Sequence, residues 1–251
     1  METVLLTALG VGGSTVVGAL LGFIFKKIPH KWNDAILSFA AGVMFAAATV
    51  GLILPAVDQT GLRGIWQVVL GILVGAVFLN LMDLLVPHLH KLSGLQEEEH
   101  RNNQNINHVF LFVLAIAIHN LPEGMAAGVS FGGENTGHAL SVAFGIMLQN
   151  VPEGMVLISP MLLAGVSRTR TFLIALTTSL IEVAGTFIGY AAGTASELLL
   201  PFALSFAGGA MLYVICDEMI PDTHAHGYER LATYSLILGF ILMIVMQAAV
   251  A

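Results

Sequence analysis

The sequence predicts an all-α, polytopic membrane protein with eight transmembrane helices. Of its 251 residues, 57% are hydrophobic and only 10% are charged, a balance that is not typical of a soluble domain of this length. The chain also contains eight apolar runs, each close to the ~20 residues that a helix needs to cross a bilayer. We therefore expect a single transmembrane domain over residues 1–251, with the lipid bilayer as its surroundings.

The eight runs are separated by short connections that contain Gly, Pro, Asn, Asp or charged residues. The runs are Val4 to Phe25, Ala35 to Leu54, Ile65 to Val86, Val109 to Phe131, Ala139 to Leu163, Thr171 to Gly193, Leu198 to Ile220 and Leu231 to Val250. One connection, residues 87–108, is longer and polar and contains several histidines. We expect it to be a flexible loop.

The basic residues predict how the chain is oriented in the membrane. Eight of the nine Lys and Arg residues follow the first, third, fifth or seventh run, and only Arg63 lies in the other set of connections. Because basic residues are retained on the cytoplasmic side, both termini are expected outside the cytoplasm and the loop 87–108 inside it. The expected location is the cell membrane.

Glycines recur four residues apart within the runs. Such spacing lets helix backbones approach closely, so we interpret these glycines as packing positions and not as part of a binding site. The pairs are Gly18 with Gly22, Gly71 with Gly75, Gly124 with Gly128, Gly185 with Gly189, and Gly189 with Gly193.

A repeated motif provides the first candidate site. The fourth run contains HNLPEGM, which begins at His119, and the fifth contains QNVPEGM, which begins at Gln149. In each copy the first residue and the glutamate, Glu123 or Glu153, are four apart and share a helix face. Both copies begin about ten residues into their run, close to the middle of the bilayer. Because the two helices run in opposite directions, His119 should lie near the depth of Glu153, and Glu123 near that of Gln149.

The prolines of the motif add further polar groups at this depth. Pro122 and Pro152 lack an N–H, so they are expected to bend their helices and to free the carbonyls of Ile118 and Leu148. A free carbonyl inside a membrane needs water, an ion or a side chain as its partner.

The sixth run adds a third carboxylate, Glu182, at a similar depth, and Asn120 and Asn150 add amides. Each ionised carboxylate costs on the order of 3 kcal/mol or more at the bilayer centre, and no Lys or Arg lies within a run to balance the charge. The counter-charge must therefore be protons or a metal ion. Imidazole with carboxylates suits zinc, iron, manganese or cobalt, and a lone Cys216 excludes a cysteine-based zinc site. The alternative is that protonated carboxyl groups and a neutral histidine satisfy one another.

The segments HNLPEG, QNVPEG and TSLIEVAG resemble the fourth, fifth and sixth spans of the ZIP (Zrt- and Irt-like) metal transporters, most of all their bacterial GufA-like branch. The resemblance implies a homodimer, with spans 1–3 and 6–8 related by inversion around a central pair of spans 4–5. It also implies a two-metal site. His119, Glu123, Gln149 and Glu153 would hold one ion, and Asn120, Asn150 and Glu182 would join both bridging glutamates around a second. Gln149 replaces a common second histidine and Asn150 a position that can be acidic, which implies a more permissive site.

Other residues are weaker candidates for a metal pathway. Asp58, at the outer end of the second span, could attract incoming cations, although an exposed carboxylate is more often only solvated. Met44 lies mid-span and resembles a family position beside the metal path, although a buried Met is more often packing. A release path toward the cytoplasm would use residues that can also be simple solvated helix ends. These are Asp83, His88, His90, Asp217, Glu218, His224 and His226. We interpret His30 and His138 as surface residues.

These observations predict uptake of divalent transition-metal ions into the cytoplasm by alternating access, with Zn²⁺ as the first candidate and Cd²⁺, Fe²⁺, Mn²⁺ and Co²⁺ as others. The metal is the transported substrate, and we expect neither a catalytic cofactor nor enzyme activity. No basic tract with interleaved aromatic residues supports nucleic-acid binding. Two alternatives stay open: an intramembrane metalloenzyme, although HExxH is absent, and a proton channel.

Overall fold

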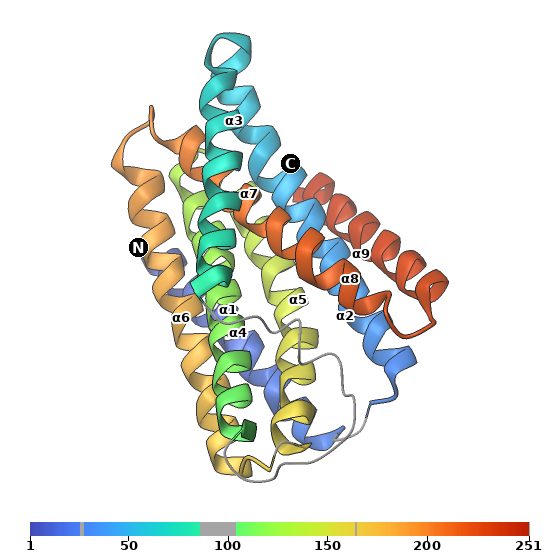
Figure 1. Cartoon of the computed structure of the whole chain (residues 1–251). Coiled ribbons are helices and arrows are strands. Elements are labelled where there is room, and N and C mark those ends of the chain that lie inside the picture. Colours follow the sequence, from blue (N-terminus) through green and yellow to red (C-terminus); the bar gives the residue numbers. More distant parts are fainter. Residues whose placement is uncertain (26–27, 86–103, 164, 251) are drawn as a thin grey trace.

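The computed structural model describes residues 1–25, 28–85, 104–163 and 165–250, and all regular structure within them is helical (Figure 1). This confirms the predicted all-α class. The helices are α1 (Glu2–Ile24), α2 (His30–Ala46), α3 (Leu54–Leu85), α4 (Gln104–Val129), α5 (Thr136–Leu163), α6 (Arg168–Ala195), α7 (Leu200–Val214), α8 (Ile220–Thr223) and α9 (Glu229–Val250). The described residues also include two π-helical segments, η1 (Ala47–Ile53) and η4 (Ile215–Met219), and a short 3₁₀ turn, η3 (Ser130–Gly132).

Six helical segments of the described residues are long and apolar enough to cross a membrane. The longest is 53 residues, His30–Met82, and joins α2, η1 and α3. Gly61 interrupts it with a φ of +56°, a left-handed conformation that a residue without a Cβ adopts at little cost. The chain therefore reverses near Gly61, and α3 forms the tip at the top of Figure 1.

The outward faces of the bundle are apolar. On α9, for example, Ile237, Leu238 and Ile241 are all exposed. So large an apolar surface would make a soluble protein aggregate, but it is what a helix in contact with lipid presents. The fold is therefore that of a multi-pass membrane protein.

Close helix pairs organise the bundle, and glycines make them possible. α1 packs on α5, α4 on α6, α2 on α9, and α3 on α7. A Cβ added to Gly128 would lie 1.9 Å from the carbonyl oxygen of Thr186, and one added to Gly18 would lie 2.2 Å from that of Val151. The glycines spaced four apart thus bring helix backbones into contact, as their spacing predicted.

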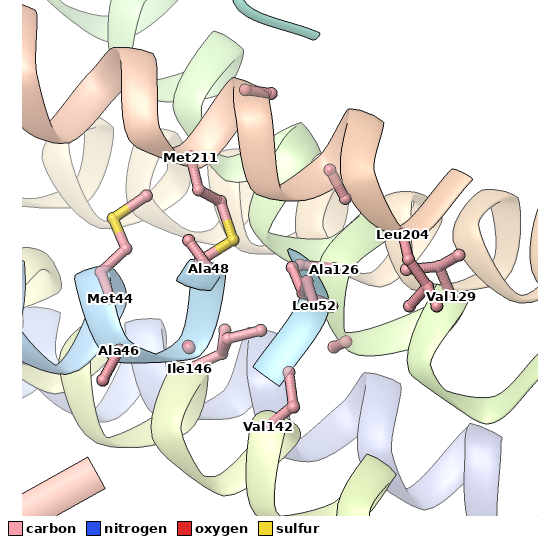
Figure 2. Packing of buried hydrophobic residues seen from close by; sticks show 14 of the residues in the cluster. Met44, Ala46, Ala48, Leu52, Ala126, Val129, Val142, Ile146, Leu204 and Met211 are labelled. Atoms are coloured by element: carbon pink, nitrogen blue, oxygen red, sulfur yellow. The ribbon is translucent and has the colours of Figure 1, made fainter. Parts of the chain in front are cut away.

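The main apolar core lies between α2, η1, α4, α5 and α7, as Figure 2 shows. Met44 of α2 and Met211 of α7 face one another across it, and Leu52 and Ile146 fill the space beside them. All four side chains are fully buried. This core excludes water from the part of the bundle near the start of α5 and the end of α4.

One end of the bundle collects basic residues. Helices α2, α6 and α9 all begin there, with Lys31, Arg168 and Arg230 in their first turns, and α5 ends there. We call this end the basic end. The positions of other residues along the bundle are given relative to the basic end.

The glycine contacts generate a stability prediction. We expect Gly128→Ala to lower the free energy of unfolding by about 1–3 kcal/mol, because its methyl group would meet the Thr186 carbonyl. Gly13→Ala is the matched control, since a Cβ at Gly13 has no heavy atom within 4 Å. Denaturant unfolding of the two purified proteins in detergent would measure the difference. Equal stabilities would contradict this account of the packing.

Candidate metal centre

The two copies of the repeated motif lie inside α4 and α5, which run in opposite directions relative to the basic end. Pro122 and Pro152 both fall within these helices. The motif glutamate Glu123 is 1% exposed and Gln149 is fully buried. Polar side chains of both helices are thus removed from water deep inside an apolar bundle.

The side chains pair across the two helices as antiparallel packing predicts. His119 of α4 lies close enough to Glu153 of α5 to act on its charge. The Glu123 carboxyl lies beside the Gln149 amide and contacts the Glu153 carboxyl. Two adjacent carboxylates repel one another unless a proton or a cation lies between them.

Glu182 of α6 adds the third carboxylate, and its charge acts on Glu123. The Thr15 hydroxyl of α1 donates to both Glu182 oxygens at 2.9 Å, and Asn150 Nδ2 donates to Oε2 at 3.1 Å. Thr15 is not among the residues predicted from the sequence. The available signal was its place on the face of α1 that is made of small residues, between Gly12 and the buried Ala19.

The motif glycines explain how these groups meet. A Cβ on Gly124, which follows Glu123, would lie 2.1 Å from the carbonyl oxygen of Glu182. A Cβ on Gly154, which follows Glu153, would lie 2.3 Å from that of Thr15. Each Glu-Gly pair therefore places its carboxylate next to a neighbouring helix whose own polar side chain enters the site.

Glu218 borders the centre on the side of the basic end. Its Oε1 lies 2.8 Å from Nε2 of His119, and it sits in the π-helical segment η4. His119 is 18% exposed and Glu218 28%, whereas Glu182 is 1% exposed. Sequence alone predicted Glu218 only as part of a release path, but the structure places it in contact with the central histidine.

The centre has unsatisfied hydrogen-bonding capacity. Nine buried side-chain atoms of the described residues have no hydrogen-bond partner, and five belong to the predicted ligands. They are Asn120 Nδ2, Glu123 Oε2, Gln149 Oε1, Gln149 Nε2 and Asn150 Oδ1. Buried polar atoms without partners are costly, and hydrated or partly hydrated cations supply both charge and hydrogen bonds.

The described residues do not form a closed metal-binding geometry: no three His, Cys, Asp or Glu side chains among them are gathered for one ion. Two of the candidate ligands make hydrogen bonds to other side chains instead. Glu182 is held by Thr15 and Asn150, and His119 is held by Glu218. A cation would have to exchange these hydrogen bonds for coordination.

The other predicted pathway residues are dispersed. Met44 is fully buried in the apolar core, which matches its packing interpretation, and Asp58 is exposed beside the Gly61 reversal. Asp217 lies in η4 next to Glu218. The side chain of Asp83, and all of His88 and His90, lie outside the described residues, as does most of the loop 87–108, whose last five residues belong to α4.

The remaining histidines make specific contacts. His224 links the two helices on either side of its connection, with Nδ1 2.8 Å from the Ile220 carbonyl of α8 and Nε2 3.1 Å from the Thr233 hydroxyl of α9. His226 lies 3.1 Å from Asp34, and its ring stacks on His30. His138 is not a plain surface residue, because its Nε2 lies 2.9 Å from the Gly51 carbonyl of η1.

An apolar helical bundle that encloses three carboxylates, an imidazole and several amides, most of them buried, has the features of a membrane transporter for cations. A family model described as ZIP Zinc transporter matches residues 88–247. The chain belongs to the ZIP family, which confirms the resemblance noted in the sequence, and this is a family of transporters and not of enzymes.

Individual relatives cover nearly the whole chain. The protein named Zinc transporter GufA of Myxococcus xanthus is 37% identical over 249 residues, 97% of each chain. Zinc transporter ZIPB of Bordetella bronchiseptica is 36% identical over 94% of this chain and 77% of its own. Zinc transporter ZupT of Chlorobium phaeovibrioides is 36% identical over 95% and 94%. The GufA-like character predicted from the motifs agrees with these matches.

The contacts of Glu182 generate a second prediction. Thr15→Val should lower the free energy of unfolding by about 1–3 kcal/mol, because the buried carboxyl loses a hydroxyl donor to both oxygens. Thr15→Ser, which keeps the hydroxyl, should remain close to the original protein. Thermal unfolding in detergent at neutral pH would compare them. A valine variant as stable as the serine variant would show that this hydroxyl does not stabilise Glu182.

Proposed function

We propose that this protein carries Zn²⁺, and related ions such as Cd²⁺, Fe²⁺, Mn²⁺ and Co²⁺, across the membrane through the centre between α4, α5 and α6. The observation that supports it best is a centre with three interacting carboxylates, of which Glu123 and Glu182 are buried and Glu153 is partly buried, without any Lys or Arg in the middle of these helices. A divalent cation supplies the missing charge. The three relatives are named zinc transporters, which favours zinc among such cations.

The proposed ligands fall into two groups around the bridging glutamates Glu123 and Glu153. The first ion is bound by these two together with His119 and Gln149, and the second by the same two together with Asn120, Asn150 and Glu182. The contacts between His119 and Glu153, and between Asn150 and Glu182, support this division. One imidazole among oxygen ligands suits zinc while leaving the ion able to depart, which transport requires.

The proposal includes eight spans. Gly61 divides the 53-residue segment into two helices, and α4 adds one further span to the six segments that are long and apolar enough. The described packing also supports an inverted relation between spans 1–3 and 6–8. In such a relation α1, α2 and α3 correspond to α6, α7 and α9, and α4 corresponds to α5. The α1–α5 pair then corresponds to α6–α4, and the α2–α9 pair to α7–α3. All four pairs are present in the structure.

The environment of the centre supports a direction of transport. Ile146 precedes Gln149 in α5, which ends at the basic end, so the apolar core around Leu52, Ile146 and Met211 lies on the side of the centre away from the basic end. The partly exposed side chains, His119 and Glu218, lie on the other side. With the basic end in the cytoplasm, the ion enters from outside when this core opens, exchanges its waters for the central ligands, and leaves past Glu218 and Asp217 after the core closes.

The proposal also includes a homodimer in the cell membrane, with both termini outside the cytoplasm. The charge bias of the connections supports the orientation. The dimer is an expectation from the family alone, and analytical ultracentrifugation of the detergent-solubilised protein would test it.

Removal of either bridging carboxylate should abolish transport. We expect Glu123→Gln and Glu153→Gln to reduce Zn²⁺ uptake into proteoliposomes by at least about 100-fold, because each variant keeps the side-chain shape but loses a charge shared by both ions. The control is Glu197→Gln, which removes an exposed carboxylate between α6 and α7 and should transport normally.

Robust uptake by either glutamine variant would contradict the assigned centre. Proton flux that does not require metal would favour a channel instead, and it would appear in the same vesicles loaded with a pH-sensitive dye.

Protons should compete with the transported ion. A carboxylate must release its proton before it binds a metal ion, so metal affinity falls by up to about tenfold per pH unit for each proton displaced. We expect the KM for Zn²⁺ to rise as the external pH is lowered from about 7.5 to about 5.5, with a smaller change in the maximal rate. Initial uptake rates at several zinc concentrations would measure this. A KM that stays constant over the range would exclude proton competition at the central carboxylates.

A further inference from the structure

A second polar cluster lies at the basic end, where the beginning of α2 meets the connection between α8 and α9. It consists of Asp34 and His30 from α2, Asp222 from α8, and His226 from the connection. His226 Nδ1 lies 3.1 Å from Asp34 Oδ1, and the His226 and His30 rings stack with centroids 4.5 Å apart. Asp222 interacts electrostatically with the other three.

Asp34 is the buried anchor of this cluster. Its side chain is 0% exposed, and its Oδ2 atom has no hydrogen-bond partner. One helical turn further along α2, the fully buried Ser38 hydroxyl also has none. A buried carboxylate with only one hydrogen bond, next to a second carboxylate, leaves an excess of negative charge that favours a cation.

The Asp34–His226 contact orients the imidazole for metal binding. An ionised Asp34 accepts a hydrogen bond from Nδ1–H of His226, and this fixes the tautomer in which Nε2 carries the lone pair. The same carboxylate–histidine arrangement orients histidine ligands in many zinc sites. His226 is 30% exposed, so ions in the surrounding solution can reach it.

The neighbouring histidine, His224, has both ring nitrogens engaged. Nδ1 contacts the Ile220 carbonyl of α8 and Nε2 contacts Thr233 of α9, so His224 holds the start of the connection in place. His226 follows two residues later and precedes Gly227, whose φ is +84°. The connection is therefore anchored at His224 and presents His226 toward α2.

We propose that His226, His30 and Asp222 bind one divalent transition-metal ion at the basic end, with Asp34 as the buried residue that positions His226. Two imidazoles and a carboxylate, with water in the remaining position, suit Zn²⁺ or Co²⁺. The three side chains are not gathered around one point in the structure, but His30 and Asp222 are exposed and can rotate toward an ion at His226. The site joins α2 to the connection between α8 and α9, and it is independent of the central ligands.

The site also continues the polar path from the centre. Asp222 interacts with the charge of Glu218, and Glu218 contacts His119. An ion that leaves the centre toward the basic end would therefore encounter these ligands next. Binding to them does not require the transport that we proposed above, and the experiment treats the two separately.

The test uses full-length protein with the central site disabled by Glu123→Gln and Glu153→Gln together. Purified protein in detergent is titrated with Co²⁺, whose visible absorption reports imidazole and carboxylate coordination, and zinc retained after dialysis is counted per chain. We expect one ion per chain in this background. Adding His226→Asn should abolish binding, and Asp34→Asn should weaken it about 10- to 100-fold, as loss of an orienting carboxylate does at other sites.

Two further variants make the result specific. His226→Cys keeps a metal ligand at the position and should retain zinc, which a merely structural role of His226 would not explain. Glu229→Gln removes an exposed carboxylate at the start of α9 and should leave binding unchanged. Gel filtration and thermal unfolding verify that each variant is folded.

Retention of the ion by a folded His226→Asn variant would overturn the proposal, because the metal would then lie elsewhere in the chain. Absence of any bound ion in the glutamine background would overturn it as well. If the unmodified protein still takes up zinc in either case, the central transport site stands while this second site does not.

Discussion

The enclosure of three acidic side chains in an apolar bundle, two of them buried and Glu153 partly buried, is the constraint on which the rest of the structure depends. No Lys or Arg lies in the middle of the helices that hold Glu123, Glu153 and Glu182, so their charge must be balanced by hydrogen-bond donors, protons or metal ions. Thr15 and Asn150 supply donors to Glu182, and His119 lies beside Glu153. These contacts join α1 to α6, α5 to α6 and α4 to α5, and the glycine-rich packing of the pairs α1–α5 and α4–α6 holds the four helices close enough to make them.

The Pro-Glu-Gly segment combines the chemistry and the packing in three residues. Proline removes a backbone hydrogen bond, the glutamate supplies the ligand, and the glycine admits the backbone of a neighbouring helix. Gly124 contacts the backbone at Glu182, and Gly154 contacts the backbone at Thr15. Thr15 in α1 thus occupies the position that Glu182 occupies in α6. The inverted relation that we proposed between the two halves accounts for this correspondence of position.

Much of this centre could be predicted from the sequence because helical periodicity and helix direction are local properties. They gave the pairing of His119 with Glu153 and of Glu123 with Gln149. Thr15 and Asp34 could not be found this way, because their roles depend on which faces of distant helices meet. His138 was interpreted as a surface residue because its partner, a backbone carbonyl, has no sequence signal. That carbonyl belongs to a π-helical segment, where the usual hydrogen-bond register is interrupted.

Transport also requires that the ligands release what they bind, and the hydrogen bonds of the centre contribute to this. A cation that binds Glu182 must replace donors from Thr15 and Asn150, and one that binds His119 must separate it from Glu218. The cost of breaking these hydrogen bonds is subtracted from the free energy of coordination, so binding is weaker than in a rigid preformed site. Once the ion leaves, Thr15 and Asn150 donate again to Glu182, and His119 pairs again with Glu218. In the proposed cycle, Glu182 and His119 therefore have partners both with the ion bound and after it has left.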